Sequence, residues 1–118
     1  MAGTIVSDTV QDGTGNSCTT TQVVKGAARA WVNFNMANPP VINGTPYNVS
    51  SITRITTGQY TVNFTTAMPN ANYCATFNSN NGARYQWFDT FTTTSLNVYS
   101  FSSAYDDTPL CCVAVFSY

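Results

Sequence analysis

Asp106-Asp107 is the only adjacent pair of carboxylates in the chain. Hydrolysis of a glycosidic bond needs two carboxyl groups roughly 5–9 Å apart that face one sugar, whereas neighbouring residues of an extended chain point to opposite faces. Asp89 could join one of the two, but no motif requires it. The sequence also contains no His and no Glu, which excludes Ser-His-Asp nucleophilic chemistry. We therefore expect a turn before Pro109, no cofactor and no enzymatic activity.

Neither the aspartates nor the cysteines have the spacing of a metal site. Asp8, Asp12 and Gly13 faintly resemble a calcium loop, but the spacing differs from an EF-hand and the closing Glu is missing. Two cysteines are adjacent rather than separated by two residues, and no histidine accompanies them. We expect no metal, and reduced thiols buried as small apolar side chains. The four thiols are Cys18, Cys74, Cys111 and Cys112.

Aromatic side chains are concentrated in the segment YQWFDTF, whose alternate residues share the parity of a strand. Exposed rings flanked by amides and carboxylates can form a sugar platform, because ring faces stack on sugar C–H bonds and polar groups hold the hydroxyls. The alternative is that the rings form the core or a subunit interface, where aromatic residues are enriched. The candidate glycan platform consists of Arg84, Tyr85, Trp87, Asp89 and Phe91.

Charged residues are sparse, with four Lys and Arg against five Asp and a net charge of -1. Binding to nucleic acid needs a basic stripe, so we expect no nucleic-acid partner. No stretch approaches the ~18 apolar residues of a membrane span, and we expect no membrane insertion. Met1 is followed by neither a basic start nor an apolar run of signal length, which favours synthesis in a cytosol.

Alternation of apolar and polar residues predicts a β-domain over residues 26–118. The clearest strand holds Tyr60, Val62 and Phe64 on one face. The segment 73–78 alternates in the same way, so a hairpin between the two is expected. No helical period is found, and strands every 8–12 residues are typical of a sandwich. Further strands are expected in 28–35, 48–55, 85–93, 95–101 and 110–118.

Two segments depart from simple alternation. After Val49 the apolar residues change parity, which predicts either a bulge at Ser50-Ser51 or a strand with apolar surroundings on both faces. The last strand is apolar on both faces, which places it in the centre of a sandwich or against another subunit. The predicted oligomer interface consists of Trp31, Val113 and Val115.

Residues 1–25 form a polar lead-in with a turn signal, DGTGN, at residues 12–16. The segment has little apolar surface to bury and should not be ordered alone. We therefore expect an extended N-terminal arm that docks on a neighbouring protein.

Four segments resemble a module at the C-terminus of bacteriophage tail-fibre and other virion structural proteins, especially of marine and cyanobacterial phages. They are AWVNFN (30–35), NVSSITR (48–54), GQYTVNFTTAMPNANY (58–73) and VAVFSY (113–118). The resemblance spans roughly residues 24–118. It implies a β-sandwich, commonly trimeric, displayed at a fibre tip or on the particle surface, and it carries no catalytic motif.

The combined prediction is an all-β, antiparallel, jelly-roll-like sandwich (26–118) in a homotrimer, with an arm (1–25) that docks on other virion proteins. The expected protein is made in the host cytoplasm and resides in the virion, as a tail-fibre or tail-tip component that attaches to a host surface glycan. The alternative is a capsid decoration or head-fibre protein with a structural role. An adhesin should expose its aromatic residues at the end distal to residue 1, whereas a decoration protein should bury them between subunits.

Overall fold

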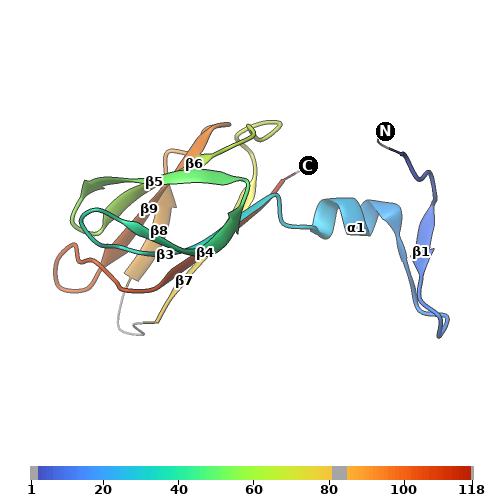
Figure 1. Cartoon of the computed structure of the whole chain (residues 1–118), viewed down its shortest axis with the longest axis horizontal. Helices are drawn as coiled ribbons and strands as arrows, with labels where there is room; N and C mark the ends of the chain where they lie inside the picture. The colour runs from blue at the N-terminus through green and yellow to red at the C-terminus, as the bar shows by residue number, and fades with distance from the viewer. Residues whose placement is uncertain (1–2, 81–84, 118) are drawn as a thin grey trace.

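The computed structural model describes residues 3–80 and 85–117 of the chain. Two antiparallel sheets of four strands pack together (Figure 1), which confirms the predicted all-β sandwich at this level. In chain order the elements are β1 (Thr9–Gln11), β2 (Ser17–Thr19), α1 (Thr20–Gly26), β3 (Ala30–Asn35), β4 (Val41–Tyr47), β5 (Val49–Thr56), β6 (Gln59–Phe64), β7 (Cys74–Ser79), β8 (Tyr85–Asp89), β9 (Ser95–Phe101) and β10 (Cys111–Phe116). The strand orders are β4-β3-β10-β7 and β5-β6-β9-β8, and β1 pairs with β2 outside them.

The core lies between the two sheets and is built from the alternating residues that the sequence predicted. β3 buries Val32 and Phe34, while β6 of the facing sheet buries Tyr60 and Val62. The rings of Phe34 and Tyr60 meet across the core, with their centroids 6.0 Å apart. Each buried side chain of this kind contributes about 1.5–3 kcal/mol, so these two strands fix which face of each sheet points inward.

The predicted hairpin between residues 60–65 and 73–78 is wrong. β6 pairs with β5 and β9, whereas β7 pairs with β10 in the other sheet. The chain between β6 and β7 crosses from one sheet to the other, and buried Met68 and Tyr73 anchor this crossing. The Tyr73 ring packs edge-on against Phe64 at 5.8 Å. Two strands of the same period can therefore follow one another without pairing.

Each of the two irregular segments adopts one of its two predicted alternatives. The register of β5 against β6 shifts between Val49 and Ser51, which confirms a bulge at this point. β10 lies in the middle of its sheet, between β3 and β7, which confirms a central strand. One face of β10 is buried in the core, and the other belongs to the outer face of the sheet, the face that points away from the second sheet.

The sequence did not predict four of the elements, which are β1, β2, β4 and α1. β4 pairs with β3 at a sheet edge, and edge strands are the place in a sheet where a proline such as Pro46 is tolerated. α1 contradicts the prediction of no helix. Thr19 and Gln22 form a reciprocal capping box at its start, and such caps satisfy the first free N–H groups of a helix. Its seven residues are too few to show a period.

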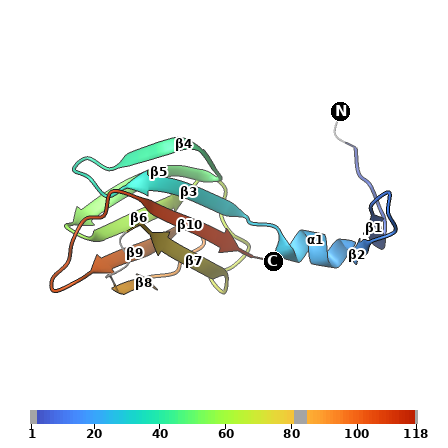
Figure 2. The same cartoon turned by 90° about the horizontal axis from the view of Figure 1, so that it is seen from below.

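Residues 3–26, here called the N-terminal segment, lie outside the sandwich (Figures 1 and 2). The β1-β2 hairpin and α1 give this segment local structure, in place of the extended arm that was predicted. The predicted turn forms around Asp12, whose carboxylate accepts hydrogen bonds from the N–H groups of Thr14 (2.8 Å) and Asn16 (3.0 Å). Hydrogen bonds from the side chains of Asn16 and Thr14 also hold the pKa of Asp12 well below its usual range. No residue of α1 is buried.

Candidate ligand-binding face

One group of aromatic side chains gathers on the outer face of β8 and β9. β8 is an edge strand, and the side chains of Tyr85 and Trp87 alternate with inward-facing residues. Trp87 lies opposite Tyr99 in the antiparallel register. Their ring planes are 3° from parallel with centroids 5.2 Å apart. Tyr85 is 72% exposed and Trp87 37%, so the stacked pair leaves aromatic surface open to solvent.

The loop after β9 extends this group of rings. Phe101 forms an isolated bridge with Tyr105, and their rings meet edge-on at 5.5 Å. The ring centroid of Tyr105 also lies 5.9 Å from that of Trp87, and the Tyr105 side chain is exposed. We call these five side chains the aromatic patch: Tyr85, Trp87, Tyr99, Phe101 and Tyr105.

A band of amides and hydroxyls adjoins the aromatic patch on the same outer face. Gln59 of β6 lies beside Tyr99 in register. In the next row the hydroxyl of Thr61 donates to Asn97 Oδ1 at 2.8 Å, and Asp89 pairs with Asn97 across β8 and β9. Flat aromatic surface next to fixed donors and acceptors is the combination that a sugar-binding platform needs.

The structure brings together most of the predicted platform but not all of it. Tyr85, Trp87 and Asp89 share the outer face of β8, as predicted. Phe91 does not join them, because Thr90 has a left-handed φ of 51° that breaks the alternation. The Phe91 ring instead packs on Tyr73 at 5.2 Å and on Phe88 at 6.1 Å. Arg84 lies outside the described residues.

Sequence reasoning missed Tyr99, Phe101 and Tyr105 as members of the patch. The first two share parity along a strand whose existence was predicted, so alternation carried a signal for their common face. Their closeness to Trp87 depends on the pairing of β8 with β9, and pairing is not readable from a single sequence.

The predicted interface residues separate onto two faces. Val113 and Val115 are 3% and 1% exposed and point between the sheets of their own chain. Their assignment to an oligomer interface is therefore corrected, since they are covered without a second subunit. Trp31 lies on the outer face of its sheet and is 46% exposed, opposite Tyr47 of β4 and Ala114 of β10. Its role in an interface stays a prediction.

The Asp106-Asp107 pair lies in the loop before Pro109, and Asp107 has a structural role. Its carboxylate accepts hydrogen bonds from Gly58 N at 2.7 Å and from the Tyr60 hydroxyl at 3.0 Å. Arg54 lies 3.6 Å from the second carboxylate oxygen. Burial, assisted by the negative charge of Asp107, raises the pKa of Tyr60 to about 12, although the hydrogen bond from Arg54 acts in the opposite direction. This network ties the β5-β6 turn to the loop after β9.

The cysteines carry thiols rather than disulfides. Burial as a small apolar side chain holds for Cys111 but is wrong for Cys74 and Cys112, which are exposed. Cys18 is half-buried. Within residues 3–80 and 85–117, no three or more cysteines and aspartates lie close enough together to hold a metal ion. Over the same residues, no helix is long and apolar enough to span a membrane.

Comparison of the chain with protein-family models, curated proteins and solved structures found no match. The resemblance to phage virion modules therefore stays a prediction that depends on the four sequence segments.

Proposed function

We propose that the protein is a structural component of a bacteriophage virion, at a tail fibre or tail tip, where a trimeric β-sandwich attaches to a glycan of the host surface. The observation that carries this proposal is the aromatic patch, in which Trp87 and Tyr99 stack beside exposed Tyr85 and Tyr105. Contiguous exposed apolar surface of this kind is typical of interaction sites. The adjoining amides and hydroxyls supply the polar contacts that a hydroxyl-rich ligand requires.

The place of the aromatic patch in the fold also supports attachment. β5 begins beside Arg29, which follows α1, because Asn48 donates a hydrogen bond to the Arg29 carbonyl. β5 then runs to the turn at the other end of the sandwich, where Gln59 pairs with Tyr99. The patch and the N-terminal segment are thus at opposite ends (Figure 1). In the proposed assembly the N-terminal segment docks on other virion proteins, and the patch faces outward.

A second candidate function is capsid decoration or a head fibre, with a purely particle-stabilising role. The observation that favours it is exposed Trp31 on the outer face of the β4-β3-β10-β7 sheet. The described residues of that outer face include no charged side chain on β3, β4, β7 or β10. Depletion of charge and enrichment in aromatic residues are typical of the centre of a protein interface. The same face would serve the proposed trimer.

The test is binding of labelled protein to an array of bacterial surface glycans and to candidate host cells. Trp87→Ala removes the centre of the aromatic patch, and Ile55→Ala is the control because it removes an exposed apolar side chain from β5, at the other edge of the same sheet. Circular dichroism and light scattering check that each variant keeps its fold and subunit number. Saturable binding that is lost only in Trp87→Ala supports attachment through the patch. Absence of binding by folded wild-type protein, or equal binding by Trp87→Ala, contradicts it.

A further inference from the structure

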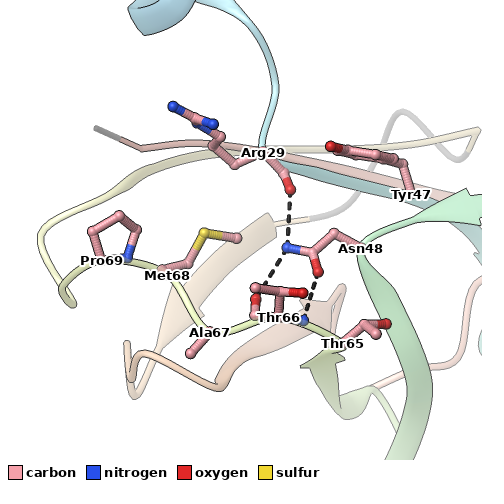
Figure 3. A pocket seen from close by; sticks show the side chains of 8 residues that line it. All are labelled: Arg29, Tyr47, Asn48, Thr65, Thr66, Ala67, Met68 and Pro69. Atoms are coloured by element: carbon pink, nitrogen blue, oxygen red, sulfur yellow. Dashed lines mark hydrogen bonds between the residues drawn. The ribbon is translucent and has the colours of Figure 1, made fainter. Parts of the chain in front are cut away.

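A cavity lies at the end of the sandwich nearest α1, opposite the aromatic patch. It has a volume of about 410 Å³, which is within the range of roughly 300–1,000 Å³ found for small-molecule sites. Figure 3 shows Arg29 on one side of it and Tyr47 on the other, with Asn48 between them and Thr66 below. The four residues come from the start of β3, the passage from β4 to β5 and the chain after β6.

Asn48 holds the base of this pocket in place. Its backbone adopts a left-handed φ of 53°, a conformation that asparagine tolerates better than most residues. Its side-chain amide donates to the carbonyls of Arg29 and Thr66, both at 3.1 Å, and its Oδ1 accepts from Thr66 N at 2.7 Å. Three segments that are distant in sequence are therefore tied together before any ligand arrives, and such preorganisation lowers the cost of binding.

Arg29 gives the pocket a positive charge, and among the described residues no carboxylate forms an ion pair with it. Its Nε donates to the Ser117 carbonyl at 3.2 Å, which orients the guanidinium. Within residues 3–80 and 85–117 no carboxylate lies within salt-bridge distance of Arg29, whereas Arg54 is held by Asp107. None of the described residues that line the pocket is acidic. The forked donors of a guanidinium match a carboxylate group.

The other walls suit a sugar ring better than a bare anion. Tyr47 is 54% exposed and presents an aromatic surface, and Pro69 adds an apolar surface. Thr65 and Thr66 are also lining residues, and a threonine hydroxyl can both donate and accept a hydrogen bond. A bare inorganic anion would leave the aromatic and apolar walls at Tyr47 and Pro69 without contact.

We propose that this pocket binds a carboxylate-bearing sugar residue, such as a hexuronic acid. The carboxylate accepts hydrogen bonds from Arg29, the sugar ring packs on Tyr47, and the threonine hydroxyls contact the sugar hydroxyls. The site uses none of the residues of the aromatic patch. It can therefore be present whether or not the patch binds a host glycan.

The test is titration of the full-length protein with glucuronic acid, glucose and acetate, followed by NMR chemical shifts or calorimetry. Glucuronic acid should bind at least about tenfold more tightly than glucose or acetate, because only it engages both the guanidinium and the ring. Arg29→Gln should weaken its binding roughly tenfold or more, since a charge-assisted hydrogen bond is lost. Tyr47→Ala should weaken it severalfold. Lys25→Gln removes the same charge outside the lining and should change affinity by less than about twofold.

Thermal unfolding of each variant checks that Arg29→Gln keeps its fold after losing the bond to Ser117. Arg29→Lys keeps the charge but not the forked geometry, so it should bind glucuronic acid more weakly than the wild type does. It takes the place of Arg29→Gln in the test if the fold of that variant is disturbed. Several results would overturn the proposal. These are no binding of glucuronic acid by folded protein, equal binding of acetate or glucose, and unchanged affinity in both Arg29 variants. Shifts confined to the β8-β9 face would assign the acidic sugar to the aromatic patch instead.

Discussion

Trp87 of β8 and Tyr99 of β9 stack across the strand pair, with ring planes 3° from parallel and centroids 5.2 Å apart. The pair lies on the outer face of the sheet and takes no part in the core between the sheets. Loss of one ring should therefore lower the stability by removing contacts on the outer face, and it should leave no cavity in the core.

We expect Trp87→Ala to lower the free energy of unfolding by about 2–4 kcal/mol, because Trp87 is only 37% exposed. The loss combines the buried apolar area of the ring with the about 0.5–1.5 kcal/mol that an aromatic pair contributes beyond that area. Urea unfolding followed by circular dichroism measures the change. A loss above about 4 kcal/mol would mean that Trp87 is part of the core, and the variant could not then serve as a binding test.

Gly58 and Gly44 provide a matched pair for backbone strain. Both have a left-handed φ, 68° and 69°, which costs a residue with a Cβ roughly 1–2 kcal/mol. A Cβ on Gly58 would lie 2.5 Å from the Ser100 carbonyl oxygen, whereas one on Gly44 meets open space. Gly58→Ala should therefore destabilise the fold by about 3 kcal/mol or more, and Gly44→Ala by about 1–2 kcal/mol. Similar midpoints in chemical unfolding would contradict the close packing at Gly58.

Stability should fall at alkaline pH because of Tyr60. Its pKa rises from 10.0 to about 12 in the folded chain, so the folded state holds the phenolic proton more tightly than the unfolded state does. The contribution is fully present below pH 10 and is lost as the pH rises towards 12, by up to about 1.4 kcal/mol per pH unit. Urea unfolding at pH 8, 10 and 11.5 measures the slope.

Tyr60→Phe is the control for this pH dependence. It should cost about 1–3 kcal/mol at pH 8, because Asp107 and the Ala37 carbonyl lose a donor. It should also flatten the alkaline fall. Tyr73, whose pKa burial also raises, leaves a residual slope. An undiminished slope in Tyr60→Phe would show that other groups govern the alkaline range.

The thiols should differ in reactivity according to their exposure. Cys74 and Cys112 are exposed on the outer face of their sheet, and Cys111 is buried. A thiol reagent should modify Cys74 and Cys112 in the native protein and Cys111 only after unfolding, since access controls the reaction. Mass spectrometry of peptides from labelled protein identifies the sites. Native labelling of Cys111 would contradict its place in the core.

Alternation in the sequence predicted the faces of β3 and β6 because a strand with one buried face repeats every two residues. The same logic failed at Phe91, where the left-handed Thr90 changes the direction of the chain. It also placed Val113 and Val115 at an interface, because a central strand between two packed sheets has the same pattern as a strand pressed against a second subunit.

Pairing was the part of the fold that the sequence could not supply. The wrong hairpin between β6 and β7 and the missing patch members Tyr99 and Tyr105 have this one cause. Which strands become neighbours in a sheet depends on the packing of the whole sandwich and not on a local signal in the sequence. α1 was missed for the opposite reason, since the capping box of Thr19 and Gln22 is local but the helix is short.

The position of β3 in its sheet has a mechanical consequence. The chain enters the sandwich from α1 at the start of β3, which lies between β4 and β10. A pull on the N-terminal segment, with the aromatic patch held at the far end, acts along the strands. The backbone hydrogen bonds that join β3 to β4 and to β10 are then loaded in shear. They must break together and cannot open one at a time. This geometry resists load along the long axis of the molecule.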